Sequence, residues 1–416
     1  MEKGLEQRIV DSPVFSKSFT GFALYDPELK AMLFESDADK YFTPASNTKI
    51  LTFYTALSIL GDSLPTLHYT TLNDTLIFWG TGNPMLLHPD FEQTDDPIKF
   101  LKNRPEKLFF SNHNYQDQRF GPGWSWDDYP FYYQPEKAAM PIYGNIVRIK
   151  RDSLTVGIDI HPEFFRDSFV YQPGTHEEYP YVRRVEYGNR FDHNKLAVLG
   201  PSYERDRPFD YSTDLLVKLL EDTLNKEVEL WKQPEFNPTS WQTLSEPLPD
   251  TLWQQFMKDS DNFIAEQLLL MCSDVLFDTI NTDKVIAYAK DSLFQNFPDS
   301  LIWRDGSGLS RYNLFTPRTF VHLWEALYEK VPRQRLFDLL PAGGQSGTIK
   351  NWYGAEEPYI FGKTGTLSNK HCLSGYIVCD SGKTLIFSFM HKDYITGTSP
   401  IKKEMERVLE WIKGAF

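Results

Sequence analysis

Residues 44–54, Pro-Ala-Ser-Asn-Thr-Lys-Ile-Leu-Thr-Phe-Tyr, place a serine, Ser46, three residues before a lysine, Lys49, at the start of an apolar helical run. On a helix this spacing puts the two side chains on one face, one turn apart. The amino terminus of a helix directs N–H groups and positive potential at the hydroxyl, which favours an oxyanion there. A buried lysine can lose its proton and act as a base. The stretch predicts a serine nucleophile with a lysine base.

A second short motif, Ser260-Asp261-Asn262, stands at the start of another helical run. The Ser260 hydroxyl can relay a proton between a base and a leaving amine. The Asn262 amide offers a donor and an acceptor together, which suits the backbone amide of a substrate. In isolation the motif is more typical of an ordinary helix cap.

The third motif is Lys363-Thr364-Gly365-Thr366, which follows a short apolar run at residues 359–362. Lys363 and Thr364, facing a cleft from an edge strand, suit a terminal carboxylate, and Gly365 lets a ligand backbone approach. A surface strand carrying a charge is the alternative explanation. The first motif is also weak in isolation, because residues 399–402 repeat Ser-x-x-Lys with no apparent catalytic role.

Together, and in this order, Ser-x-x-Lys, Ser-Asp-Asn and Lys-Thr-Gly are the joint signature of β-lactamases and penicillin-binding proteins. Further stretches are similar to one branch of that superfamily: Gly-Thr-Gly-Asn-Pro at 80–84, Trp-Ser-Trp-Asp-Asp at 124–128 with two tyrosines at 132–133, and Gly-Gln-Ser-Gly-Thr at 344–348. The most specific is Asp-Gly-Ser-Gly-Leu-Ser-Arg at 305–311. The chain resembles the D-alanyl-D-alanine carboxypeptidase/endopeptidase family, penicillin-binding protein type 4-like (peptidase family S13).

The resemblance implies roles for the motif residues. Ser46 attacks the carbonyl of the penultimate D-alanine of a peptidoglycan stem peptide, and Lys49 accepts its proton. Ser260 passes a proton to the departing D-alanine, while Asn262 holds the acyl-side amide and orients the lysine. A β-lactam would stop at the acyl-enzyme, because its leaving group stays tethered.

The resemblance also implies the binding groups around the reacting carbonyl. Lys363 and Thr364, beside Gly365, bind the terminal carboxylate, and the backbone N–H groups of Ser46 and Thr366 form the oxyanion hole. For the rest of the stem peptide, the substrate-binding candidates are Trp124, Asp127 and Arg311. Packing within an inserted domain is an equally good explanation for the tryptophan.

The chain of 416 residues is long enough for two to three domains. The long gap between Ser46 and Ser260 holds an aromatic-rich segment, and the family inserts extra domains there. We expect a discontinuous catalytic domain, residues 1–61 plus 238–416, interrupted by one or two mostly β subdomains at 62–237. The implied fold is α/β (α+β): a penicillin-recognising serine transpeptidase/β-lactamase-like domain with an antiparallel sheet flanked by helices.

Local patterns predict the parts of that domain. Residues 21–26 and 31–35 are typical of two strands, and residues 372–380 and 384–391 of a hairpin. Helical spacing covers 260–276, 317–329 and the apolar positions of 405–412. The last helix carries charges of both signs, which favours packing on the sheet over lying on a membrane.

One stretch tests the choice of branch. Residues 221–225, Glu-Asp-Thr-Leu-Asn, match the motif that supplies the deacylating glutamate of class A β-lactamases, but here it precedes Ser-Asp-Asn instead of following it. Its amphipathic surroundings favour an ordinary helix surface. We therefore assign Glu221 no part in deacylation.

Composition excludes several classes of function. A formal net charge of −14 repels phosphate backbones and anionic lipid, so nucleic-acid binding is not expected. No apolar run is long enough to cross a bilayer. The 3 cysteines and 9 histidines lack the spacing of a zinc site, and we expect neither a metal nor a cofactor.

Two alternatives and the location stay open at this point. A β-lactamase or serine esterase on the same fold would share the motifs, and a catalytically silent peptidoglycan-binding protein would keep the shape without acylation. Residues 1–6 lack the apolar core of a signal peptide, as in a cytosolic protein or in a mature chain that has lost its export signal. The resemblance implies a periplasmic or otherwise exported protein, because peptidoglycan lies outside the cytoplasmic membrane.

Overall fold

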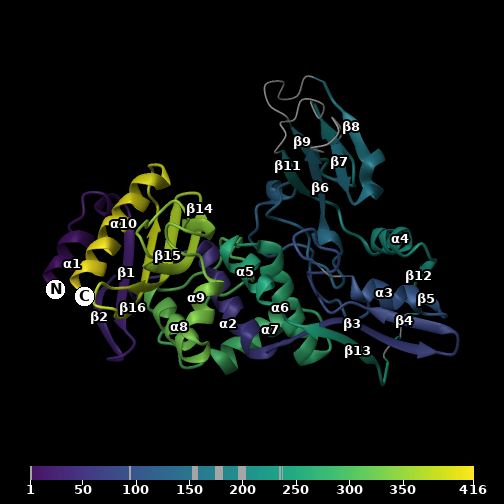
Figure 1. Ribbon diagram of the computed structural model, residues 1–416, viewed down its shortest axis with the longest axis horizontal. Coiled ribbons are helices and arrows are strands. Elements are labelled where there is room, and N and C mark those ends of the chain that lie inside the picture. Colours follow the sequence, from purple (N-terminus) through teal and green to yellow (C-terminus); the bar gives the residue numbers. More distant parts are fainter. Residues whose placement is uncertain are drawn as a thin grey trace.

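A computed structural model describes residues 2–92, 95–151, 158–173, 181–194, 203–233, 236 and 238–416. Figure 1 shows a body of sheet and helices at one end, where both termini lie, and a second region of strands at the other. Helices connect the two, and a small group of strands projects away from the long axis.

The sheet of the first body combines the two ends of the chain. Its strand order is β14-β15-β16-β1-β2, and every neighbouring pair is antiparallel. Phe22, near the amino terminus, pairs with Phe389, near the carboxyl terminus. The strands are β1 (Phe19–Asp26), β2 (Ala31–Ser36), β14 (Ile360–Leu367), β15 (Lys370–Val378) and β16 (Thr384–Lys392). Both pairs of strands that the sequence predicted are confirmed.

Side chains alternate between the two faces of this sheet, as the pleat requires. Phe22 and Leu24 pack with α1 (Glu2–Ile9) and α10 (Thr398–Ala415) on one face. Ala23 and Tyr25 belong to the core on the other face, with the central helices. Helix α10 buries Ile401, Met405, Val408, Leu409 and Ile412. Its packing on the sheet confirms the prediction for the last helix, and the antiparallel sheet flanked by helices confirms the expected fold class.

Two of the three motifs lie at the amino ends of the central helices. Helix α6 buries residues all around its circumference, including Glu266 and Gln267, because it runs through the middle of the molecule. Asp261 caps its amino terminus by accepting a hydrogen bond from the Ile264 N–H. These helices are α2 (Lys49–Ile59), α5 (Asp250–Lys258), α6 (Asn262–Phe277), α7 (Thr282–Tyr288), α8 (Pro317–Lys330) and α9 (Arg333–Leu339).

The described residues between α2 and α5 form three further sheets. The largest has the order β12-β5-β4-β3-β13, and two three-stranded sheets, β11-β6-β7 and β8-β10-β9, make up the projecting part. The strands of the large sheet are β3 (Ser63–Leu72), β4 (Thr75–Trp79), β5 (Lys107–Phe110), β12 (Val228–Leu230) and β13 (Gln242–Pro247). Helices α3 (Asp96–Asn103) and α4 (Thr213–Leu224) accompany it. The small sheets contain β6 (Ile146–Arg151), β7 (Ile158–His161), β8 (Phe169–Tyr171), β9 (Val182–Arg184), β10 (Phe191–His193) and β11 (Glu204–Pro208).

Strand β13 bears on the division into domains. It pairs with β3 from Gln242 opposite Tyr69 to Pro247 opposite Ser63, so it completes the sheet of the inserted region. The expected boundary at residue 237 lies outside the described residues. The division stays a prediction, and this pairing favours a boundary after Pro247. None of the helices in the described part of the chain combines the length and apolar character needed to span a membrane.

Candidate active site

The first motif lies where a 3₁₀ turn, Ala45–Thr48, leads into α2. Lys49 is the first residue of the helix, and Ser46 precedes it by one turn. The Lys49 ammonium donates a hydrogen bond to Ser46 Oγ over 3.1 Å. Ala45 has a φ of 49°, an unusual left-handed conformation for alanine that turns the chain just before the serine. The structure thus brings nucleophile and base together as the spacing predicts.

Lys49 is fully buried, and its two other acceptors come from distant parts of the chain. Its Nζ donates to Asn262 Oδ1 over 2.5 Å and to the backbone carbonyl of Ser307 over 2.7 Å. Burial lowers the pKa of Lys49 to about 8, against the opposing charges of Asp261, then Asp305 and Glu266. A lysine with this pKa exchanges its proton near neutral pH, which is what a general base requires.

The second and third motifs meet across the cleft. Lys363 donates from Nζ to Ser260 Oγ over 2.7 Å and to its neighbour's carbonyl, Thr364 O, over 2.9 Å. Ser260 has a φ of 61°, so the turn before α6 is held in a left-handed conformation. Burial, and then the charge of Lys49, holds the pKa of Lys363 well below its usual value. The site therefore contains two hydrogen-bonded serine–lysine pairs, and the serines of both pairs line the same cavity.

Glycine is required in the third motif because β14 runs against the turn that carries the nucleophile. A Cβ on Gly365 would lie 2.3 Å from Pro44 O and 2.9 Å from Ser46 N. Beside it, Thr364 donates from Oγ1 to Thr348 Oγ1 over 2.6 Å. This close approach sets the backbone of Thr366 beside that of Ser46.

A buried acidic residue organises the loop that contributes Ser307. Asp305 accepts hydrogen bonds from the backbone N–H groups of Gly308 and Ser310, and from the side chains of Asn313 and Trp124. The Trp124 bond, from Nε1 to Asp305 Oδ2, is 2.8 Å long. These bonds make residues 305–310 a rigid support for the base.

Glu266, on α6, holds the same loop from below. Its carboxylate accepts from the N–H groups of Gly306 (3.1 Å) and Ser307 (2.7 Å). Burial, and next the charge of Asp305, raises its pKa. A chain of contacts therefore runs from Glu266 through the Ser307 carbonyl to Lys49.

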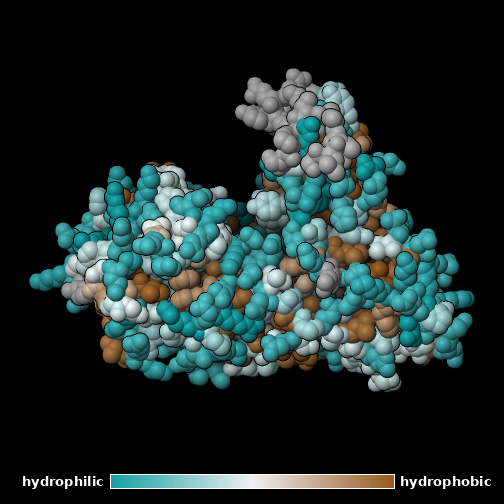
Figure 2. Space-filling model, viewed as in Figure 1, coloured by the Kyte–Doolittle hydropathy of each residue, from teal (hydrophilic) through white to brown (hydrophobic). Residues whose placement is uncertain are grey.

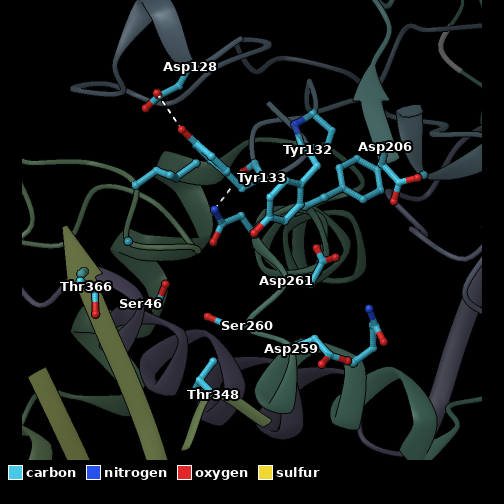
Figure 3. Close-up of a pocket in the computed structure, with 18 of the residues that line it drawn as sticks. Ser46, Asp128, Tyr132, Tyr133, Asp206, Asp259, Ser260, Asp261, Thr348 and Thr366 are labelled. Atoms are coloured by element: carbon cyan, nitrogen blue, oxygen red, sulfur yellow. Dashed lines mark hydrogen bonds between the residues drawn. The ribbon is translucent and has the colours of Figure 1, made fainter. Parts of the chain in front are cut away.

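A cavity of about 640 Å³ opens above these residues. Figure 3 shows Ser46, Ser260 and Thr366 at one part of it, and Asp206 and Asp259 farther along. Figure 2 shows a recess between the body that carries β14 and the projecting strands. The lining residues that carry hydroxyl or amide groups are Ser46, Tyr132, Tyr133, Gln255, Ser260, Asn262, Thr348, Thr366 and Ser368.

The cavity lining carries more acidic than basic side chains. Its carboxylates belong to Asp90, Asp128, Asp206, Asp259 and Asp261. Arg148 neutralises two of them, because it contacts Asp206 over 2.7 Å and Asp90 over 2.5 Å. Burial raises the pKa of Asp261 to about 6, so this carboxylate is largely ionised at neutral pH. The surplus of negative charge suits a ligand that carries a cation along this wall.

The residues singled out in the sequence fall into three groups. Ser46, Ser260, Asn262, Thr366 and Arg311 line the cavity. Lys49, Lys363, Thr364 and Gly365 lie behind that lining, each with little or no exposed surface.

Trp124 and Asp127 form the third group. Trp124 is half-buried and bonded to Asp305, as described above. Asp127 is exposed and does not line the cavity, whereas its neighbour Asp128 does. Asp128 also accepts a hydrogen bond from the Tyr133 hydroxyl over 2.8 Å. Substrate contacts by Trp124, Asp127 and Arg311 stay predictions.

Several residues of the site received no role from sequence reasoning. Thr348 follows the Gly-Gln-Ser-Gly run, and Asp305 opens the Asp-Gly-Ser-Gly-Leu-Ser-Arg run. Both stretches carried the resemblance, but neither of these two residues was assigned a role. Glu266 stands four residues after Asn262, and this helical spacing was the available signal. Glu221 lies on α4 and accepts from the Val228 N–H, outside the cavity lining. Among the described residues, no group of three histidine, cysteine or acidic side chains is arranged to hold a metal ion.

Comparisons with known proteins agree with this geometry. The model of the D-Ala-D-Ala carboxypeptidase 3 (S13) family matches residues 1–413. The chain is 24% identical to D-alanyl-D-alanine carboxypeptidase DacB of Haemophilus influenzae, over 96% of this chain and 90% of that protein. It is 23% identical to a D-alanyl-D-alanine carboxypeptidase of an Actinomadura species, over 94% of this chain and 81% of the relative.

Solved structures show the same fold. The crystal structure of penicillin binding protein 4 from Haemophilus influenzae superposes with a TM-score of 0.77 at 21% identity, covering 99% of both chains. A predatory peptidoglycan endopeptidase from Bdellovibrio bacteriovorus superposes with a TM-score of 0.53 at 17% identity, over 96% of this chain and 94% of that one. With a family match over almost its whole length, the chain belongs to the D-Ala-D-Ala carboxypeptidase 3 (S13) family of serine peptidases.

Proposed function

We propose that this protein cleaves the terminal D-Ala-D-Ala bond of peptidoglycan stem peptides through an acyl-enzyme on Ser46. The observation that carries the proposal is the setting of Lys49: fully buried, 3.1 Å from Ser46 Oγ, and held by Asn262 and Ser307. A neutral lysine at this position can take the serine proton as the hydroxyl attacks. The backbone N–H groups of Ser46 and Thr366 would then stabilise the oxyanion.

Ser260 and Lys363 would act on the leaving side. The peptide nitrogen of the departing D-alanine needs a proton, and Ser260 can deliver one while Lys363 replaces it through their 2.7 Å hydrogen bond. The lowered pKa of Lys363 favours such a transfer. The carboxylate of the terminal D-alanine would approach the hydroxyl groups of Thr348 and Thr366, with Lys363 and Thr364 behind them. Its negative charge would raise the pKa of Lys363 and hold the ammonium form in place.

Water would release the acyl-enzyme and restore Ser46. A β-lactam would acylate Ser46 in the same way, but its leaving group stays tethered and obstructs the water. A structure of the Haemophilus influenzae penicillin binding protein 4 contains a β-lactam, and its likeness to this chain (TM-score 0.71, 20% identity) supports the same fold around the serine.

Cross-linked stem peptides are a second substrate that we propose for the same site. Asp259 and Asp261 flank Ser260, and Asp90, Asp128 and Asp206 also line the cavity, so the cavity offers space and negative charge to a second, amine-bearing peptide. Endopeptidase activity would follow from that space.

Action on peptidoglycan would require the protein to work outside the cytoplasmic membrane, in the periplasm or an equivalent exported location.

Labelling with a fluorescent penicillin tests the proposal. We expect a stable covalent adduct on the wild-type chain and none on Ser46→Ala, with D-alanine released from a D-Ala-D-Ala peptide by the wild type alone. Absence of label and of D-alanine from the wild type would support a silent binding protein instead. An adduct that turns over within seconds, with little D-alanine release, would support a β-lactamase.

A further inference from the structure

Four aromatic side chains are exposed on two loops that also contribute to the cavity lining, one through Asp128 and Tyr132 and the other through Arg311. Trp126 is 75% exposed, Tyr132 66%, Tyr312 59% and Phe131 46%. Large aromatic side chains bury most of their surface in an ordinary soluble protein, and a cluster of exposed ones marks an interaction surface. We call these four residues the aromatic rim.

The rim stands on two loops that are bonded to each other. Arg311 donates its backbone N–H to Gly123 O over 3.3 Å, and Ser310 Oγ donates to Pro122 O over 2.6 Å. The Tyr312 ring lies directly against Gly123, since a Cβ at that glycine would be 2.8 Å from it. The two loops that carry the rim residues are therefore joined, although residues 126 and 312 are far apart in sequence.

Buried contacts hold this surface in place. The Phe131 ring stacks on Tyr133 with centroids 5.5 Å apart and an interplanar angle of 5°. Gln134 donates from Nε2 to Ser125 O over 3.1 Å, which closes the segment between them into a compact loop. The Trp124 bond to Asp305 fixes its start. Rings that are already positioned lose little conformational freedom when a ligand binds, so such a surface is suited to recognition.

Two features indicate what the rim binds: its continuity with the cavity, and the negative charge of the cavity and of the whole chain. Tyr132 belongs both to the rim and to the cavity lining, so the rim is continuous with the space that would hold a peptide. The carboxylates of the cavity and the net charge of −14 repel anionic polymers such as nucleic acids, wall phosphates and acidic lipids. Neutral sugar rings present apolar C–H faces bordered by hydroxyl groups, and tryptophan and tyrosine match them with an apolar face and a polar edge.

We propose that the aromatic rim binds the glycan strand of peptidoglycan, the chain of N-acetylated amino sugars from which the stem peptide hangs. The inference rests on the proposed function, because it takes the peptide in the cavity to be a stem peptide. It adds a second binding surface, for sugar, to a site that otherwise recognises only peptide. The enzyme would then act preferentially on stem peptides that remain attached to glycan.

Sedimentation with insoluble glycan tests the inference without catalysis. The protein is Ser46→Ala, and the glycan is chitin, an uncharged and insoluble polymer of N-acetylglucosamine that carries no peptide. Because two aromatic contacts are lost, we expect Trp126→Ala with Tyr312→Ala to weaken the apparent affinity roughly tenfold. Leu29→Ala with Tyr187→Ala is the matched control, since these side chains are 66% and 77% exposed and lie outside the cavity lining, and it should bind like the parent.

Failure of the parent chain to sediment with glycan, or equal losses in the two double variants, would overturn the inference. In the otherwise wild-type chain, the rim double variant should raise KM for a glycan-attached stem peptide relative to KM for the free peptide. Equal KM changes for both substrates would overturn it as well. Penicillin labelling reports separately on the proposed function: glycan binding without labelling would reject only the acyl-enzyme, and labelling without glycan binding only the rim.

Discussion

Lys363 donates a hydrogen bond to Ser260 Oγ over 2.7 Å, and this contact joins strand β14 to the turn before helix α6. Neither residue belongs to the stretch that carries the nucleophile. Their pairing repeats the arrangement of Lys49 and Ser46, with a lysine hydrogen-bonded to a serine. In the proposed mechanism one pair would take a proton and the other would return one.

Replacing this lysine should separate activity from stability. In Lys363→Met we expect kcat/KM for a D-Ala-D-Ala peptide to fall by roughly 10²-fold or more, because the proton relay and the charge near the carboxylate are lost. The free energy of unfolding should change by less than about 1 kcal/mol, since lost hydrogen bonds are offset by removal of a buried amine. Peptide hydrolysis and urea unfolding measure the two effects.

A lysine elsewhere provides the control for that variant. Lys402 belongs to the other Ser-x-x-Lys match and lies over the Trp352 ring, away from the cavity lining. Lys402→Met should retain full activity. Near wild-type kcat/KM in Lys363→Met would remove Lys363 from the mechanism.

The acylation rate should follow the protonation of Lys49. Only the neutral amine accepts the serine proton, and burial lowers the pKa of Lys49 to about 8. The rate constant for acylation by penicillin should therefore rise about tenfold per pH unit below pH 8 and level off above it. Rapid-mixing measurements of adduct formation between pH 6 and 9 give this profile.

Replacing Asp261 should shift the pH dependence of the acylation rate constant. Its negative charge favours the ammonium form of Lys49 and is the largest of the charges that oppose the effect of burial. Asp261→Asn removes the charge and keeps a good helix cap, so the pKa of Lys49 should fall and the rise in rate should occur at lower pH. An unchanged or higher midpoint would contradict Lys49 as the titrating base.

The order of the motifs allowed much of the site to be predicted from the sequence. In the structure Lys49 is hydrogen-bonded to Ser46 and Asn262, and Lys363 is hydrogen-bonded to Ser260. Each of these five residues lay in a short motif with its own local signal. The strands that precede and follow the motifs were also visible, because their apolar runs are bounded by turn residues. Residues that act alone through tertiary contacts had no such signal.

Glu266 and β13 show where local patterns do not reveal the tertiary partner of a residue or strand. Glu266 is an acidic residue in an apolar helix, and its role depends on a loop forty residues away that folds beneath Lys49. Strand β13 has mostly exposed side chains, so it lacks the alternation that marks a half-buried strand. Only pairing with β3 assigns it to the inserted sheet, and pairing partners are not encoded locally.

Trp124 can act on the substrate or on the loop that supports the base, and a conservative variant separates the two. Trp124→Phe keeps an aromatic ring at this position and removes the hydrogen bond to Asp305 Oδ2. Because it leaves a buried carboxylate with one donor fewer, we expect the free energy of unfolding to fall by about 1–3 kcal/mol. We expect KM to stay near the wild-type value. A large rise in KM with unchanged stability, measured by hydrolysis and thermal unfolding, would instead support direct contact with the stem peptide.

We expect the adjacent residues Asp127 and Asp128 to differ in their effect on substrate binding. Asp128 lines the cavity and is oriented by the Tyr133 hydroxyl, whereas Asp127 is exposed outside the lining. A stem peptide with a free side-chain amine would pair with the carboxylate that faces it, so Asp128→Asn should raise KM for that peptide by roughly 5- to 30-fold. The same peptide with its amine acetylated should show little change in KM, because the cation is absent. Asp127→Asn is the matched variant, one residue away and identical in chemistry. A selective rise in KM for the amine-bearing peptide in Asp127→Asn alone would return the role to the residue that the sequence first suggested, and would require the loop at 126–128 to turn when substrate binds.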